Sequence, residues 1–326
     1  MKLLLSADIH VKLGQKGIPK EWNKNRFLIL AERLDKIFKD YSCDLHVIMG
    51  DLTDVSNPST EELELVFASL EKLNHKGLIF TGNHELISKT ISCLFYLADA
   101  IAKATSYKWK VITEPYRSKD FDIVDYVELH KKTWIPAVGR LCLSHVRGSI
   151  PPHVQPEIDL NKFAEHGYKL VVAGDLHSYQ NTQQINDSLT LLYPGSPLTT
   201  SFHRERTKNT NGCLIIDTET LEYEWIELGD LPQLIRKTVT INDELLPDPY
   251  DRVIYEVEGD VSELKKLKGS DLLDKKINTK VSKDAKLNLE NKTTLEELAL
   301  YLTDVQGLDK ESIERLVSKA TIYVRD

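Results

Sequence analysis

The sequence predicts an α/β protein in which two packed sheets are followed by a small α+β unit and two C-terminal helices. Short apolar runs alternate with helical patterns from the N-terminus to about residue 177. Hairpin-like strands replace that alternation over residues 181–228. Alternation followed by hairpins favours an α/β sandwich of two sheets over a single doubly wound sheet.

Five apolar runs in the first half of the chain are typical of buried parallel strands. They cover residues 3–7, 46–49, 78–81, 141–144 and 170–173. Helical patterns between these runs cover residues 22–40, 59–74 and 88–104. The first has apolar residues at 3.6-residue spacing, and Ser59 or Thr60 can cap the second ahead of acidic Glu61 and Glu62.

Two later regions have the short alternation of antiparallel strands. Residues 107–136 carry short runs rich in Tyr, Trp and Val, which we expect to form antiparallel strands. Runs at 189–193, 213–216 and 223–226 predict hairpins.

The texture of the chain changes between Pro232 and Pro249. We therefore expect a main domain over residues 1–235, a small α+β capping domain over 236–290, and C-terminal helices over 291–326. The two helices, at 293–319, have apolar faces that serve either as local core or as a docking element for a partner.

Bulk composition indicates an ordinary globular protein of 326 residues, with 41% hydrophobic and 28% charged residues. No apolar stretch is long enough to suggest a signal peptide or a membrane span. The four cysteines form no close pair, which argues against a zinc knuckle or a disulfide framework. We expect a reducing cytoplasm, that of the host if the source is viral.

The net charge of −8 argues against a free-standing, high-affinity nucleic-acid binder, because phosphate contacts need clustered cations. Basic residues nevertheless flank the polar strand ends in sequence. Lys12 and Lys16 follow the first of them, and Arg204 and Arg206 follow the last. Such runs are either solvated surface or contacts to DNA phosphates.

The five apolar runs share one feature, which is that each stops at a side chain able to bind a metal ion. Ligands in open α/β sheets gather beyond the carboxyl ends of the strands, so these side chains are expected to converge. Carboxylates, carboxamides and imidazoles together suit hard or borderline divalent ions. The seven candidate ligands are Asp8, His10, Asp51, Asn83, His145, Asp175 and His177.

Seven ligands are the number that two ions sharing one bridging carboxylate require. Asp51, after a glycine on the neighbouring strand, is the natural bridge. Taken singly, a strand-end Asp is more often a helix cap than a ligand, and Gly-Asn-His is a plausible turn. The ordered set is hard to explain in that way, and His203 remains open because it lies in a basic loop.

These residues fall in motifs that resemble those of the calcineurin-like metallophosphoesterase superfamily. The matching motifs are Asp8-Ile9-His10, Gly50-Asp51, Gly82-Asn83-His84-Glu85, His145 and Gly174-Asp175-Leu176-His177. Within it, Tyr193-Pro194-Gly195-Ser196-Pro197 and Ser201-Phe202 resemble the SbcD-type nucleases of DNA double-strand-break repair. The compact length is similar to that of bacteriophage recombination endonuclease subunits.

The resemblance implies an αββα two-sheet sandwich and a metal-dependent DNA exonuclease with endonuclease activity. It implies that Asp8, His10, Asp51 and His177 hold one ion, and that Asp51, Asn83, His145 and Asp175 hold the other. His84 is the implied catalytic residue, which stabilises the transition state or protonates the leaving oxygen. An SbcC-like ABC ATPase and a second copy of the chain are the implied protein partners, with DNA as the substrate.

One position departs from the family pattern, because Asp175 stands where histidine is usual. A carboxylate can still ligate but favours hard ions, so we expect Mn²⁺, with Mg²⁺ as the second choice. Two other functions share these motifs. One is a phosphatase or small-molecule phosphodiesterase, and the other is a catalytically dead scaffold that bridges DNA and a motor subunit.

Overall fold

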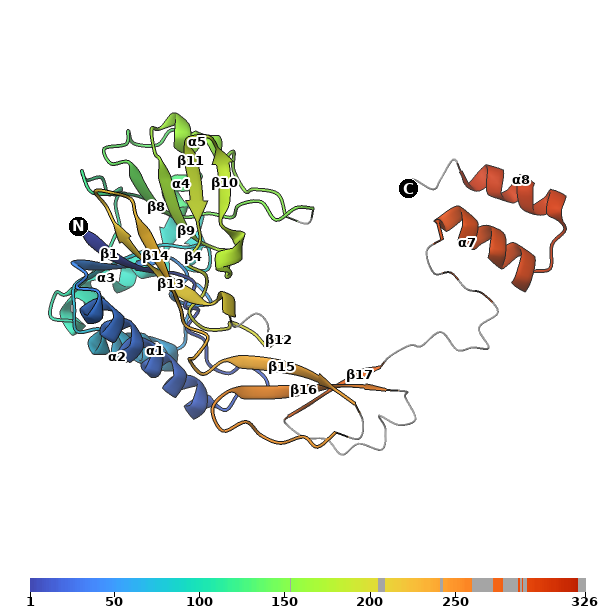
Figure 1. The fold of residues 1–326 in the computed structure, drawn as a ribbon, viewed down its shortest axis with the longest axis horizontal. Helices are drawn as coiled ribbons and strands as arrows, with labels where there is room; N and C mark the ends of the chain where they lie inside the picture. Colours follow the sequence, from blue (N-terminus) through green and yellow to red (C-terminus); the bar gives the residue numbers. More distant parts are fainter. Residues whose placement is uncertain are drawn as a thin grey trace. The chain divides into compact units, whose positions relative to one another are not determined.

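The fold is taken from a computed structural model of the whole chain (Figure 1). It describes residues 1–152, 154–204, 209–240, 243–259, 272–277, 287, 289 and 292–321. The chain divides into two compact units. The first comprises residues 1–238, 244–256 and 270–274, and the second comprises 239–243, 257–269 and 275–326.

A six-stranded sheet forms one layer of the first unit, in the order β14-β13-β1-β2-β3-β6. Strands β1, β2, β3 and β6 are parallel, and β13 joins the edge of β1 in antiparallel register. The bounds are Lys2–Ser6 (β1), Leu45–Met49 (β2), Gly77–Phe80 (β3), Trp109–Val111 (β6), Gly212–Asp217 (β13) and Tyr223–Glu227 (β14).

A five-stranded sheet forms the second layer, in the order β10-β11-β9-β8-β7. Four of its strands are parallel, and β10 forms an antiparallel hairpin with β11. The bounds are Asp122–Val124 (β7), Leu141–His145 (β8), Leu170–Gly174 (β9), Gln183–Asn186 (β10) and Leu189–Leu192 (β11).

Alternation along the strands sends side chains to two different cores. Leu3 and Leu5 of β1 pack with Leu143 and Val172 in a core between the two sheets, whereas Leu4 packs on the helical side. Helices α1 (Lys20–Asp40), α2 (Thr60–Lys72) and α3 (Cys93–Ala104) cover that outer face. Short helices α4 (Tyr126–Leu129) and α5 (Asn161–Glu165) cover the outer face of the second sheet. The predicted two-sheet α/β sandwich is confirmed.

The helix boundaries follow local chemistry. Ser59 caps α2 through a capping box with Glu62, one of the two caps the sequence allowed. Helix α1 begins after Pro19 and buries Phe27, Leu30 and Leu34 against the first sheet. Helix α3 starts later than expected, because residues 86–92 form the small hairpin of β4 (Leu86–Ser88) and β5 (Ile91–Ser92).

The expected antiparallel strands at 107–136 are wrong. Strand β6 pairs in parallel with β3 in the first sheet, and β7 pairs in parallel with β8 in the second. Only an isolated antiparallel bridge joins Tyr116 to Ile123 within the described part of this region. The two strands have three residues each, so their pattern cannot indicate that the chain crosses between sheets here.

The remaining strands form a four-stranded sheet in the order β12-β15-β16-β17. They are His203–Arg204 (β12), Leu234–Val239 (β15), Arg252–Gly259 (β16) and Leu273–Ile277 (β17). In the second unit, α7 (Thr294–Leu300) continues as a π-helical turn, η3 (Tyr301–Val305), and α8 (Lys310–Ala320) follows. The two expected C-terminal helices are therefore present, while the domain boundaries at 235 and 290 stay predictions.

No helix in the described part of the chain combines the length and apolarity that a membrane crossing requires.

A chain of buried hydrogen bonds links the first sheet to α1. Asp35 Oδ1 lies 2.9 Å from His75 Nδ1, His75 Nε2 lies 3.1 Å from His46 Nδ1, and His46 Nε2 lies 2.9 Å from Ser6 Oγ. These contacts fit neutral imidazoles that each donate toward Asp35 and accept from the Ser6 side. Burial lowers the pKa of both histidines, and that of His46 falls well below its usual value.

This series of hydrogen bonds predicts that acid destabilises the folded protein. His46 takes up a proton below about pH 6.5 when unfolded but stays neutral when folded, so stability is present above that pH and falls below it. Between pH 7 and pH 5 the loss attributable to His46 is about 2 kcal/mol. Urea denaturation at both pH values measures it. In His46→Asn the loss of unfolding free energy between pH 7 and pH 5 is smaller than in wild type by about this amount. In His130→Asn, an exposed control, it is unchanged. An equal loss of unfolding free energy in wild type and His46→Asn contradicts the assignment of the acid sensitivity to His46.

Candidate metal centre

The candidate ligands lie where five parallel strands end. β1, β2 and β3 are neighbours in the first sheet, and β8 and β9 are neighbours in the second. Asp8 and His10 follow β1, Asp51 follows β2, Asn83 follows β3, His145 ends β8, and Asp175 and His177 follow β9. The site is therefore assembled from both layers of the sandwich.

Four of these residues have a left-handed backbone. The φ angles are +54° at Asp8, +49° at His10, +51° at Asp51 and +96° at Asp175. Each such conformation costs a non-glycine residue roughly 1–3 kcal/mol and persists only where surrounding contacts impose it. The strand ends are thus held in shapes that packing alone would not select, as is common at functional sites.

Asp51 is the hub of the site. Its Oδ1 accepts a hydrogen bond from the His84 backbone N–H at 3.0 Å. Its Oδ2 lies 3.4 Å from His145 Nε2, 3.5 Å from His10 Nε2 and 4.0 Å from His84 Nε2. One carboxylate thus faces three imidazoles from different strands.

A second cluster joins Asp8, His10 and His177. The Nε2 atoms of His10 and His177 lie 3.1 Å apart. Asp8 Oδ1 accepts a hydrogen bond from the Asp175 backbone N–H at 2.9 Å, whereas buried Asp8 Oδ2 has no partner among the described residues. Leaving a buried carboxylate oxygen unsatisfied is costly, so this atom fits a cation ligand.

Asn83 and His145 meet on the other side of Asp51. Asn83 Oδ1 lies 2.9 Å from His145 Nε2. The opposite ring nitrogen, His145 Nδ1, donates to the Met49 backbone carbonyl at 2.9 Å, so in the neutral ring Nε2 carries the lone pair and faces the oxygens of Asn83 and Asp51. Such a carbonyl behind a ring fixes the tautomer that metal binding needs.

Ligand atoms converge in three overlapping groups whose members lie within 4.8 Å of one another. The groups are Asp8–His10–His177, His10–Asp51–His84 and Asp8–Asp51–His145. Asp175 belongs to none of them and reaches the site through its backbone N–H and its charge. His84, expected to act on the substrate, lies close enough to be a ligand as well.

The charges of the site favour bound cations. Burial raises the pKa of Asp8 to about 6 and that of Asp175 to about 6. Burial has the same effect at Asp51, but His145 and His10 outweigh it and hold the Asp51 pKa well below its usual range. Burial lowers the pKa of His145, but the negative charge of Asp51 outweighs this effect and raises that pKa well above its usual value. A divalent ion between these groups would neutralise the same carboxylates.

Two residues that sequence reasoning gave no role support the ligands from behind. Glu85 is fully buried and accepts hydrogen bonds from the backbone N–H groups of Asp51 (3.1 Å), Gly82 (2.9 Å) and Thr53 (3.0 Å). Asp54 Oδ1 lies 3.3 Å from His10 Nδ1, and its backbone carbonyl accepts from His84 Nδ1 at 2.7 Å. The sequence placed Glu85 in a motif, but only the fold reveals these contacts.

The segment 193–197, identified from its sequence, buttresses the same site. Ser196 Oγ lies 2.6 Å from the backbone carbonyl of Asp8, and Tyr193 OH donates to the backbone carbonyl of Val146 at 2.9 Å. These contacts fix the backbone beside Asp8 and beside His145. The segment therefore acts on the metal centre through its neighbours.

The four predicted DNA contacts are placed unevenly. Lys12 forms an ion pair with Asp54, which gives it a structural partner next to His10. Lys16 is exposed. The backbone of Arg204 lies in β12, whereas Arg206 lies outside the described residues.

Glu85 generates a prediction about metal affinity. Burial and the nearby Asp51 raise its pKa to about 7, yet both carboxyl oxygens accept backbone N–H groups. In Glu85→Gln one of those oxygens becomes an NH₂ group that faces another donor. We expect metal affinity to fall about 10- to 100-fold, as for other residues behind a ligand, when Mn²⁺ binding is followed by calorimetry.

Glu71→Gln, an exposed change on α2, is the matched control. Wild-type affinity in a folded Glu85→Gln protein would refute a positioning role for Glu85.

Comparison with known proteins agrees with this geometry. A family model described as "Calcineurin-like phosphoesterase" matches residues 1–179. The chain is 60% identical over 326 residues to the "Probable exonuclease subunit 1" of Escherichia phage T5, covering 100% of this chain and 99% of that protein.

Two solved structures have weaker similarity. A Thermus thermophilus protein is 11% identical, with a TM-score of 0.45, over 70% of this chain and 98% of that chain. The Pseudomonas putida nuclease MPE is 17% identical, with a TM-score of 0.28, over 59% of this chain and 73% of that chain. The family model spans more than half of the chain, and the phage protein spans all of it. The chain therefore belongs to the calcineurin-like phosphoesterase family, and it is a phosphoester hydrolase.

Proposed function

We propose that the chain is a metal-dependent DNA nuclease, an exonuclease with endonuclease activity, and the nuclease subunit of an SbcCD-like recombination and repair complex. The observation that carries this proposal is the convergence on Asp51 of imidazoles from both sheets. The full-length similarity to a phage protein named as an exonuclease subunit supports DNA as the substrate. A phage origin of that relative supports action in the host cytoplasm.

The residues would hold two divalent ions. Asp8, His10, Asp51 and His177 would hold one, and Asp51, Asn83, His145 and Asp175 would hold the other. The unsatisfied Asp8 Oδ2 and the Asp8–His10–His177 cluster support the first set. The contact between Asn83 Oδ1 and His145 Nε2 supports the second, in which Asp175 rests on the family resemblance because it joins none of the three clusters. The oxygen-rich donor set supports Mn²⁺, or Mg²⁺, as the ion. When bound, the ions supply an activated water and neutralise charge on the phosphate.

We propose that His84 donates a proton to the substrate. Its Nδ1 donates to the Asp54 carbonyl, so Nε2 is the free nitrogen on the site side, 4.0 Å from Asp51 Oδ2. The side chain is 38% exposed, in contrast to the fully buried His145. When Nε2 also carries a proton, a side chain that reaches solvent beside the ligands can donate that proton to the departing sugar oxygen.

Digestion of labelled DNA tests the function. With Mn²⁺, we expect the protein to degrade end-labelled linear duplex DNA and to hydrolyse a chromogenic phosphomonoester far more slowly. Gel analysis and absorbance measure the two rates. The reverse ranking would favour a phosphatase, and failure to bind two equivalents of metal would favour a scaffold without catalysis.

His84→Ala is the informative variant in that assay. Loss of a general acid lowers the rate about 10²- to 10⁴-fold while metal and DNA binding persist. A metal titration separates this role from ligation, because the loss of one bound ion would make His84 a ligand.

The C-terminal helices support the proposal of a partner. None of the described residues 292–321 is buried, and Tyr301, Val305, Leu308 and Leu316 are large apolar side chains exposed to solvent. A helix pair that buries so little of its apolar surface is a natural docking element. We propose that it binds an SbcC-like ABC ATPase and that the chain forms a homodimer.

Charged substitutions on this helix pair test the docking. Tyr301 and Leu316 are 43% and 38% exposed, so Tyr301→Glu with Leu316→Glu leaves the fold intact. We expect the affinity for the ATPase to fall roughly thirtyfold or more, because apolar hot spots dominate such interfaces. Ser318→Glu, exposed on α8, adds the same charge as a control. Unchanged affinity in calorimetry would place the docking site elsewhere.

A further inference from the structure

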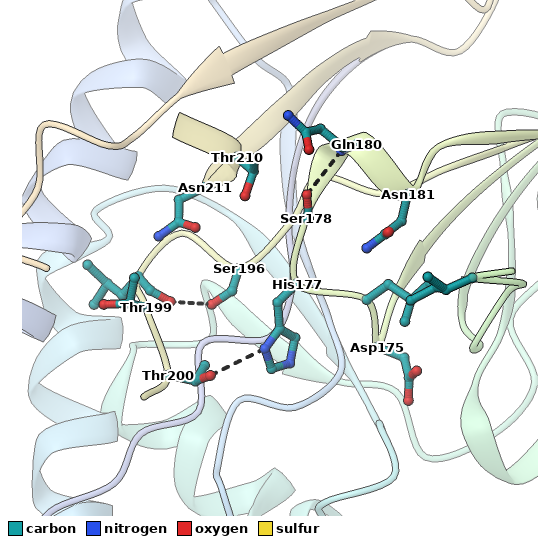
Figure 2. A pocket seen from close by; sticks show the side chains of 13 residues that line it. Asp175, His177, Ser178, Gln180, Asn181, Ser196, Thr199, Thr200, Thr210 and Asn211 are labelled. Atoms are coloured by element: carbon teal, nitrogen blue, oxygen red, sulfur yellow. Dashed lines mark hydrogen bonds between the residues drawn. The ribbon is translucent and has the colours of Figure 1, made fainter. Parts of the chain in front are cut away.

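A cavity of about 710 Å³ opens beside the metal centre (Figure 2). Asp175 and His177, two candidate ligands, form part of its wall. The rest of the polar lining consists largely of hydroxyl and amide side chains from the first compact unit. Six of these are Ser178, Asn181, Ser196, Thr200, Thr210 and Asn211.

The cavity is fixed to the metal centre by direct contacts. Thr200 Oγ1 lies 3.3 Å from His177 Nδ1, the ring nitrogen opposite the one that faces His10. Ser196 Oγ lies 2.6 Å from the carbonyl of Asp8. A molecule in the cavity would therefore touch the groups that orient two candidate ligands.

The chemistry of the wall excludes some occupants. Among the described residues that line it there is no lysine or arginine, so the cavity does not suit a second phosphate group. Hydroxyl and amide groups both donate and accept hydrogen bonds, which suits a sugar and the edge of a base. The volume lies within the roughly 300–1,000 Å³ of small-ligand sites.

Asn181 is the clearest ligand-facing group. Its backbone is fixed in the turn η1 (Tyr179–Asn181), which Ser178 caps by accepting from the Gln180 N–H at 3.2 Å. Its amide makes no hydrogen bond to another described side chain or carbonyl. In Figure 2, Asn181 lies on one side of His177, and Thr210 and Asn211 lie on the other. A side-chain amide on a fixed backbone, without a hydrogen bond at a cavity wall, is available to a ligand.

We propose that this cavity receives the unpaired nucleotide next to the scissile phosphate, so that the enzyme acts on strand ends whose terminal base has left its partner. A base that is stacked and paired in a duplex cannot reach into a cavity beside the metal centre, whereas an extruded nucleotide can. The cost of unpairing is smallest at a mismatched end, which makes such ends the better substrates. This inference rests on the proposed nuclease function.

The test compares ends that differ only in pairing. Three labelled duplexes carry a matched, a mismatched or an interstrand cross-linked terminal pair, and bis(4-nitrophenyl) phosphate reports on the metal centre alone. For wild type we expect the first cleavage to be roughly tenfold faster at the mismatched end than at the cross-linked end. In Asn181→Trp, which narrows the cavity and removes the amide, the rate on the mismatched end relative to the small diester falls roughly tenfold. Asn25→Trp, exposed on α1, is the matched control and keeps both ratios.

The outcomes distinguish failure of the proposed nuclease function from failure of the proposed nucleotide subsite. If wild type hydrolyses neither DNA nor the small diester, the proposed nuclease function fails. If it cleaves DNA but shows no dependence on terminal pairing, or if Asn181→Trp keeps the wild-type ratio, the cavity is not the nucleotide subsite. Should Asn181→Trp misfold, Asn181→Leu removes the amide at nearly constant size. A lost preference for mismatched ends then supports the subsite, and a retained preference overturns it.

Discussion

The buried carboxylate of Asp51 is the contact on which the rest of this structure depends. It lies between imidazoles from both sheets, and the surrounding backbone leaves no room for a side chain on either of two neighbouring glycines. A Cβ on Gly82 would lie 2.2 Å from Asp51 Oδ1, and a Cβ on Gly50 would lie 2.5 Å from His145 Nδ1. Gly50 also has a φ of +79°, which glycine adopts without strain. The two glycines are therefore required by the closeness of the strand ends.

Strain at the strand ends is offset by the hydrogen bonds behind them. Asp8, His10 and Asp51 all adopt left-handed backbone angles, and each is tied to the neighbouring chain. The N–H groups of Asp8 and His10 donate to the carbonyls of Gly50 and Asp51, and Glu85 accepts from Asp51. Ligand geometry thus depends on residues that touch neither metal nor substrate, which is the usual reason that supporting contacts matter as much as ligands.

Much of the site could be predicted because its signal is local. An apolar run that stops at a carboxylate or an imidazole is visible in the sequence, and the capping box of α2 is equally local. The roles of Glu85 and Asp54 could not be predicted, because their partners approach only in the folded chain. The crossing between sheets near residues 107–136 was also hidden, since three-residue strands carry too little pattern to specify their neighbours.

The contribution of both layers to one site has a mechanical consequence. Asp8, His10, Asp51 and Asn83 belong to one sheet, while His145, Asp175 and His177 belong to the other, and the Met49–His145 hydrogen bond already spans the gap. A cation coordinated by residues from both groups would therefore cross-link the two sheets. Its binding free energy would then add to the free energy of unfolding, so that removal of the ions would lower stability as well as activity.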